Sequence, residues 1–199
     1  AEHSPVAHPR LLHGVQLWVA LPDGARSTSP SWEFHGSLPA FSDARMAATV
    51  IMGELGGERS PGTAHSPIVG ADVTLEAGAD VSIPIEREFE HGVLMMSGTA
   101  NVVGTELNVG SMLYLGCGRR QLRFRCASGA RLLLLGGEPF GEQIVMWWNF
   151  VARSDEEIAE AREQWIARSA RFGDVHGAGQ RLEAPPMPPG RLIPGGPAR

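Results

Sequence analysis

Apolar and polar side chains alternate along the stretch Gln121-Leu122-Arg123-Phe124-Arg125-Cys126. Successive side chains of a β-strand point to opposite faces, so this stretch predicts a strand with one dry face and one wet face. Its apolar members would face a core, and its two arginines would share the solvated face. Gly118 and Gly129 flank the stretch, as is typical of a strand that lies between two turns.

Similar segments recur at short intervals on both sides of this strand. The segments expected to form further strands are Val15–Leu21, Thr49–Met52, Ala71–Leu75, Asp80–Ile85, Val93–Met96, Thr99–Val103, Ser111–Leu115, Arg131–Leu135 and Gln143–Trp147. Several short strands separated by glycine turns indicate a closed sandwich or barrel. The chain has 25 glycines and 15 prolines in 199 residues, which favours an all-β fold over a helical bundle.

One helix is expected towards the C-terminus. Ser154 and Glu157 form a capping box, and the acidic residues of that first turn complement the helix dipole. Gly173 supplies a left-handed stop. The prolines of Ala184-Pro185-Pro186-Met187-Pro188-Pro189-Gly190 then prevent a regular ladder. This tail is either a mobile terminus or an arm laid over a surface.

Composition excludes several classes of protein. The net charge of −5 is unfavourable for binding a polyanion, so direct binding to nucleic acid is not expected. No apolar run approaches the roughly 18 residues that a membrane helix needs, so no membrane association is expected either. Two cysteines are too few to staple a domain of this size. They fit free thiols in a reducing compartment, and we therefore expect a cytoplasmic protein.

The one local basic patch consists of Arg119, Arg120, Arg123, Arg125 and Arg131. Arg123 and Arg125 would share a strand face, from which they would meet phosphates or the acidic side chains of a partner. The alternative is a solvated strand face in an acidic protein. Aromatic residues do not alternate with these arginines, as they would in a site for single-stranded nucleic acid.

A β-barrel of this kind raises the question of a metal, because cupin barrels bind one through two short signatures. The first signature has two histidines before a glutamate, which itself stands seven positions before a glycine. If Gly98 is that glycine, His91 takes the place of the glutamate, and the histidine positions hold other residues. The second signature has Leu113 where its histidine belongs. One imidazole cannot hold a divalent ion that needs three or four protein ligands, so we expect no metal in this barrel.

Several segments resemble, in the same order, segments of the pirin family. His13-Gly14-Val15-Gln16-Leu17-Trp18-Val19-Ala20-Leu21-Pro22 is similar to the His-Gly-Leu-Gln-Leu-Trp-Val-Asn-Leu-Pro of pirins. Thr63-Ala64-His65-Ser66-Pro67 resembles their Thr-His-Thr-Pro turn, and Gly136-Gly137-Glu138-Pro139-Phe140-Gly141-Glu142 resembles their Gly-Glu-Pro-Leu-Gly-Glu. Phe150–Ile158 and Arg171-Phe172-Gly173 resemble the start and end of their terminal helix. The likeness extends over nearly the whole chain up to the proline tail.

This resemblance implies a bicupin, in which the N-terminal barrel holds an iron-type ion and the C-terminal barrel has lost its ligands. Ala1-Glu2 aligns with the Ser-Glu of the family's His-Ser-Glu segment, so Glu2 matches the glutamate ligand. The family's three histidine ligands would lie upstream of residue 1. The chain then divides into 1–46 (remnant strands of the N-terminal cupin and a linker), 47–150 (a metal-free cupin barrel), 151–173 (a C-terminal helix) and 174–199 (a proline-rich tail).

Pirin-like proteins are associated with quercetin 2,3-dioxygenase activity. The resemblance therefore implies Fe(II) or another divalent transition metal in the complete protein, together with a small aromatic, flavonol-like substrate. Because Glu2 would be one ligand of four, we do not expect this chain alone to be an enzyme. Three explanations for the missing ligands stay open. An upstream barrel supplies them, a dimer mate supplies them, or the gene product is truly truncated and lacks them.

Pirins are also described as transcription co-regulators whose metal state tunes binding to a partner protein. In that alternative the metal-free barrel, Arg123, Arg125 and the helix would dock a regulatory protein without catalysis. A third alternative is a structural half whose barrel supports its neighbour.

Overall fold

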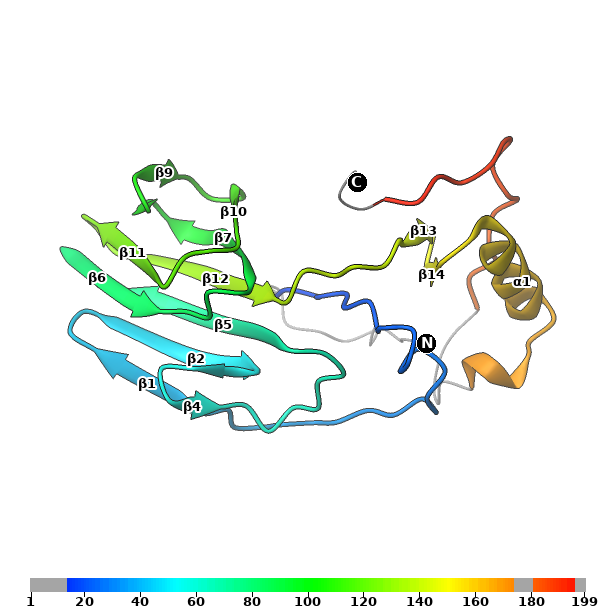
Figure 1. Ribbon diagram of the computed structural model, residues 1–199, viewed down its shortest axis with the longest axis horizontal. Coiled ribbons are helices and arrows are strands. Elements are labelled where there is room, and N and C mark those ends of the chain that lie inside the picture. The colour runs from blue at the N-terminus through cyan, green and yellow to red at the C-terminus, as the bar shows by residue number, and fades with distance from the viewer. Residues whose placement is uncertain (1–13, 174–180, 196–199) are drawn as a thin grey trace. The chain divides into compact units, whose positions relative to one another are not determined.

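The computed structural model describes residues 14–173 and 181–195 (Figure 1). Contacts group the chain into two compact units, which are described separately below. The larger unit is Leu21–Phe140, and the smaller unit contains the described residues before and after that range. No helix within the described ranges is long and apolar enough to cross a membrane.

The larger unit is built from two main antiparallel sheets. The six-stranded sheet has the order β1-β2-β5-β12-β7-β10, and the four-stranded sheet has the order β6-β11-β8-β9. A short ribbon pairs β3 with β4. The strands are β1 (Ala40–Asp43), β2 (Met46–Met52), β3 (Glu54–Leu55), β4 (Glu58–Arg59), β5 (Ile68–Leu75), β6 (Ala79–Pro84), β7 (Glu90–Gly98), β8 (Ala100–Val102), β9 (Thr105–Leu107), β10 (Met112–Gly116), β11 (Gln121–Cys126) and β12 (Ala130–Gly137).

The chain passes from one sheet to the other at almost every step between β5 and β12. Strands exchanged in this way between two sheets that share one core are characteristic of a jelly roll. The expected all-β fold with a C-terminal helix is therefore confirmed.

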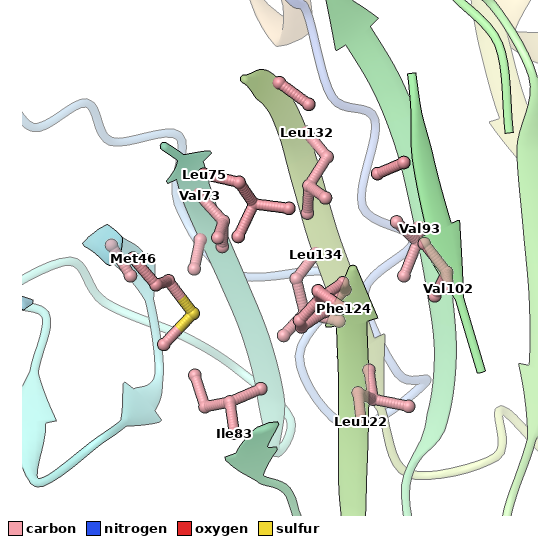
Figure 2. Packing of buried hydrophobic residues seen from close by; sticks show 14 of the residues in the cluster. Met46, Val73, Leu75, Ile83, Val93, Val102, Leu122, Phe124, Leu132 and Leu134 are labelled. Atoms are coloured by element: carbon pink, nitrogen blue, oxygen red, sulfur yellow. The ribbon is translucent and has the colours of Figure 1, made fainter. Parts of the chain in front are cut away.

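Both sheets contribute side chains to one apolar core, part of which is shown in Figure 2. Phe124 on β11 and Leu132 on β12 are both fully buried, although they come from different sheets. Along β11 burial alternates residue by residue, with Arg123 and Arg125 on the exposed face. The strand predicted at Gln121–Cys126 is confirmed together with its two faces.

The strand predicted at Val15–Leu21 is wrong, because the chain has no regular structure there. Leu17 is 41% exposed, Trp18 51% and Val19 54%. A strand needs a neighbour that pairs with its N–H and C=O groups in a regular ladder, and none of the sheets that the described residues form includes a strand from this segment. An apolar, β-branched sequence is therefore not sufficient to make a strand.

The smaller unit contains a hairpin and a helix. Its elements are β13 (Val145–Trp147), β14 (Phe150–Ala152), α1 (Asp155–Ile166) and the 3₁₀ turn η1 (Ala170–Phe172). The side chain of Ser154 accepts a hydrogen bond from the Glu157 amide at 3.2 Å, so the predicted cap is confirmed. Trp148, in the hairpin turn, packs edge-on against Trp165 with ring centroids 5.8 Å apart.

The helix is shorter than the predicted range 151–173. It ends at Ile166, Arg168 adopts a positive φ of 55°, and η1 closes at Gly173 with φ 60°. In an unbroken helix Phe172 would lie two turns, about 10 Å, beyond Trp165. The break instead lets the two rings meet edge-on with centroids 5.3 Å apart. The chain therefore packs Phe172 against the helix instead of continuing the helix for two further turns.

Residues 181–195 of the proline-rich tail form an arm along this helix. The Trp165 indole donates to the Leu182 carbonyl at 2.9 Å, and Arg162 Nε donates to the Pro185 carbonyl at 2.6 Å. Ala184 is buried in the same apolar cluster as the hairpin and the helix. Of the two alternatives left open by the sequence, the arm is the one observed for these residues.

The division into units differs from the predicted ranges. β1 lies before residue 47 but is paired with β2 along its length, and therefore belongs with the barrel. The β13–β14 hairpin begins before residue 151 but packs in the cluster of the helix. The composition of the sequence indicates neither the pairing of β1 with β2 nor the packing of the hairpin with the helix.

Candidate functional site

The predicted ligand Glu2 lies outside the described residues. Its assignment as a metal ligand therefore stays a prediction.

Arg123 and Arg125 lie side by side on the exposed face of β11, as predicted, but their charges are not equally available. Arg123 Nε and Nη2 donate to the two carboxylate oxygens of Asp80 on β6, at 2.7 and 2.6 Å. This hydrogen-bonded guanidinium lowers the pKa of Asp80, and the carboxylate in turn raises the pKa of Arg123. Arg125 makes a 3.5 Å contact with Asn101 Oδ1 and attracts Asp80 without a hydrogen bond between them. Arg125 is therefore the freer cation of the two.

The arginines do not form one continuous patch. Arg131 lies on β12 in the other sheet, where it forms a bidentate ion pair with Asp72 of β5. Arg119 is half-buried and donates to the Leu115 carbonyl at 2.5 Å. Because the two sheets enclose one core, the outer faces that carry Arg123 and Arg131 point in opposite directions.

A shallow hollow lies beside Arg125. It is lined by Gly78, Ala79, Asp80, Thr99, Ala100, Asn101, Glu106, Arg125, Cys126, Ala127 and Ser128. The lining combines one guanidinium, one amide and two carboxylates, and includes no aromatic ring. Sites for flat organic ligands are lined mainly by apolar and aromatic side chains, so this hollow does not suit a flavonol.

The described residues do not provide a set of metal ligands. Among residues 14–173 and 181–195, no three His, Cys, Asp or Glu side chains come close enough to hold an ion. At the positions of the cupin signatures, His91 is buried and Leu113 packs against the apolar core. The donors of this barrel therefore do not fit an iron-type ion, which needs several nitrogen or oxygen ligands at one point.

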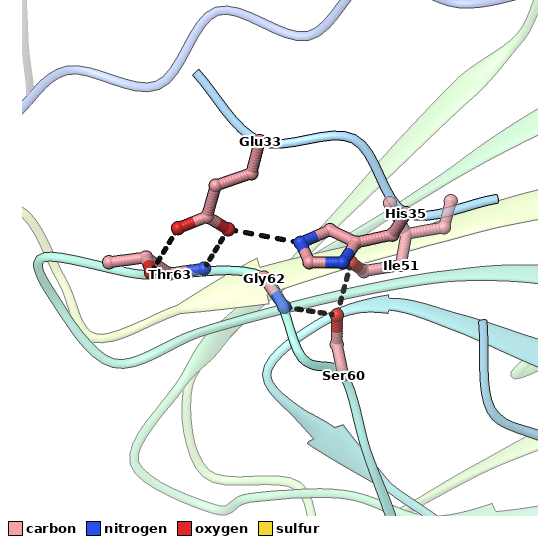
Figure 3. Close-up of polar contacts among 6 residues, drawn as sticks. All are labelled: Glu33, His35, Ile51, Ser60, Gly62 and Thr63. Atoms are coloured by element: carbon pink, nitrogen blue, oxygen red, sulfur yellow. Dashed lines mark hydrogen bonds and ion pairs between the residues drawn. The ribbon is translucent and has the colours of Figure 1, made fainter. Parts of the chain in front are cut away.

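A polar cluster that sequence reasoning missed connects two distant loops (Figure 3). The Glu33 carboxylate accepts hydrogen bonds from Thr63 N at 3.0 Å and Thr63 Oγ1 at 2.5 Å, and its Oε2 lies 3.0 Å from His35 Nε2. Nearby, buried Ser60 donates to the Ile51 carbonyl at 2.7 Å. The cluster fixes the loop before β1 onto the loop between β4 and β5. The only local signal was that Thr63 opens a segment resembling a turn of pirins.

The Glu33 carboxylate is expected to remain ionised in acid. Hydrogen bonds from Thr63, and next from His35, lower its pKa from 4.5 to about 2. A carboxyl with a lowered pKa stabilises the fold above its unfolded value, so this contribution is present above pH 4.5 and is lost as the pH falls through about 2. In an NMR titration, Thr63→Val should move the midpoint of Glu33 back towards 4.5. An unchanged midpoint would show that Thr63 is not the cause, and Thr74→Val on β5 is the matched control.

Comparison with known proteins gives one family and several relatives. The family model of the pirin C-terminal cupin domain matches residues 70–173. A Pseudomonas aeruginosa protein named "Putative quercetin 2,3-dioxygenase" is 40% identical over 180 residues, which are 90% of this chain and 57% of that protein. A "Pirin-like protein" of Caulobacter vibrioides is 31% identical over 174 residues, covering 85% of this chain and 59% of its own length.

Among solved structures, a crystal structure of quercetin 2,3-dioxygenase from Acinetobacter baumannii is similar to this chain with a TM-score of 0.82 and 40% identity. The match covers 88% of this chain and 59% of that one. The chain thus spans somewhat under three fifths of the length of these relatives. The family model covers about half of the chain and identifies its barrel as a cupin. The chain belongs to the pirin family.

Proposed function

We propose that the protein to which this chain belongs is a metal-dependent oxygenase of the quercetin 2,3-dioxygenase type. The observation that carries the proposal is the 40% identity, along about nine tenths of the chain, to a relative and to a solved structure that bear this name. Because the chain spans less than two thirds of either protein, the activity belongs to the complete protein.

In this function the metal site and the described barrel have different roles. Glu2 supplies a carboxylate ligand to Fe(II) or another divalent transition metal, and histidines outside this chain supply the rest. A metal held by histidines and one carboxylate keeps open positions for a flavonol and for oxygen. The described barrel has a filled apolar core and lacks the donor set, so its role is to support that site.

The substitution Glu2→Gln in the complete protein tests this proposal. Loss of the carboxylate ligand should lower the iron content and reduce kcat/KM for quercetin by at least the roughly 10- to 100-fold that loss of a hydrogen-bond partner of a metal ligand costs. The measurements are metal analysis, the loss of quercetin absorbance and the uptake of oxygen. Glu106→Gln, the same change on an exposed strand, should behave as wild type.

Two results would contradict the proposal at different points. If Glu2→Gln matches Glu106→Gln in iron content and rate, Glu2 is not a ligand. If the iron-loaded wild-type protein does not consume quercetin, the assigned activity is wrong. The alternative of a metal-tuned co-regulator that docks through Arg123 and Arg125 has less support, because Asp80 already pairs with Arg123.

A further inference from the structure

One buried polar side chain of the barrel has no role in the function proposed above. His91, the second residue of β7, is 2% exposed. Its register partners are Gly136 on β12 and Gly116 on β10, where the pairing is interrupted by a bulge. A Cβ atom on Gly136 would lie 2.8 Å from His91 Cδ2, so the imidazole fills space that a glycine leaves open.

The imidazole is buried with few polar partners. Neither Nδ1 nor Nε2 of His91 makes a well-aligned hydrogen bond with the described residues, although a backbone hydrogen bond with Phe89 raises the pKa of the ring. Buried polar groups nearly always have a partner, so this ring is an exception that requires an explanation. Burial is the largest cause that lowers the pKa of His91, and the ring is neutral in the closed structure at neutral pH.

Two loops close the end of the barrel around this histidine. They are the β6–β7 loop, residues 85–89, and the β10–β11 loop, residues 117–120, and together we call them the cap. Gly118 N donates to the Arg87 carbonyl at 2.7 Å, Ile85 N to the Arg120 carbonyl at 3.1 Å, and the Cys117 thiol to the Glu88 carbonyl at 3.3 Å.

The cap also covers His91 with an aromatic ring. The Phe89 and His91 ring centroids lie 6.2 Å apart, and Phe89 packs against the apolar core together with Ile85. The two loops are thus joined by few hydrogen bonds, whereas β7 itself is paired over its whole length with β12.

The groups around His91 do not compensate a positive charge on its imidazole ring. The Phe89 backbone and Glu86, both on the β6–β7 loop, favour the protonated ring, whereas burial and Arg119, on the β10–β11 loop, oppose it. On the side of β12 the ring faces Gly136, which has no side chain to offer. A protonated imidazole has two N–H donors, and the Phe89 backbone accepts from one of them at most. The other N–H therefore requires water, which comes from the solvent outside the cap.

We propose that the cap is an acid-operated latch, which opens when His91 takes up a proton and becomes hydrated. Opening separates the two loops and breaks their three cross-loop hydrogen bonds, while the two sheets stay intact. It exposes the apolar end of the barrel around Phe89. This device is independent of the proposed oxygenase activity.

Hydrogen exchange followed by NMR tests the latch on the wild-type protein at pH 7.5 and pH 5.0. The reporters are the amides of Gly118 and Ile85, which donate across the cap. After correction for intrinsic exchange rates, their opening should increase about 10- to 30-fold in acid, as expected for one proton taken up by a group with an ordinary pKa of 6.5 in the open state. Amides at the centre of β12 should remain protected.

His91→Phe keeps a ring in the slot but cannot titrate, so its cap should open equally at both pH values. His65→Gln removes an exposed histidine and should leave the wild-type response intact. If His91→Phe folds poorly, His91→Gln replaces it in the same comparison. The proposal is overturned if the non-titrating variant keeps the acid response, or if the centre of β12 opens as much as the cap in wild type.

Discussion

Replacing Phe124 with alanine is expected to reduce the free energy of unfolding of the barrel by about 3–5 kcal/mol, the usual range for a phenylalanine removed from a core. Phe124 is among the largest side chains that are fully buried, and it lies in the core to which both sheets contribute (Figure 2). Its loss removes apolar burial and leaves a cavity that two hydrogen-bonded sheets cannot close. Since a domain is stable by only about 5–15 kcal/mol, this one change takes away a large share.

Urea unfolding followed by far-ultraviolet circular dichroism measures the change. Arg125→Ala is the matched control, because it alters the next residue of the same strand on the exposed face. That variant should stay within about 0.5 kcal/mol of wild type. A loss below about 1 kcal/mol for Phe124→Ala would mean that the core is not packed around this ring.

Gly53→Ala is expected to be the second large effect. Gly53 follows β2 with a φ of 68°, and an added Cβ would lie 1.8 Å from the Ile68 carbonyl oxygen. The left-handed conformation alone costs a non-glycine residue about 1–2 kcal/mol. The collision requires β5 to move as well, and such overpacking adds about 1–3 kcal/mol.

Gly57→Ala separates the two contributions. Gly57 has a φ of 84°, but an added Cβ would find no atom within 4 Å. Its substitution should show the conformational cost alone, by the same urea titration. Equal losses in the two variants would show that Ile68 moves away freely and that the close approach has no energetic consequence.

The strands that the sequence predicts well are those whose side chains alternate between core and solvent. β11 is found at its predicted bounds because six consecutive residues carry that pattern. β1, β3, β4 and β9 are not among the predicted strands, since two to four residues rarely establish a period. Val15–Leu21 was predicted and is not a strand, because pairing depends on a neighbour that local sequence does not name.

For the candidate site, the sequence predicts which side chains are exposed but not which distant residues they pair with. The exposed positions of Arg123 and Arg125 follow from the alternation along one strand. The pairing of Arg123 with Asp80 does not, since the partners are 43 residues apart and meet through the register of β6 with β11. Glu33 and Thr63, 30 residues apart, meet through loops whose paths no periodicity describes.

The distribution of indole rings has a practical consequence for optical work on this protein. Of the five tryptophans, Trp18, Trp147, Trp148 and Trp165 belong to the smaller unit. The larger unit has only Trp32, which is 85% exposed and is therefore already surrounded by solvent. Tryptophan fluorescence consequently reports on the hairpin, the helix and the arm. Unfolding of the jelly roll should change tryptophan emission little. An emission melt would follow the smaller unit, whereas a backbone dichroism melt would follow both units.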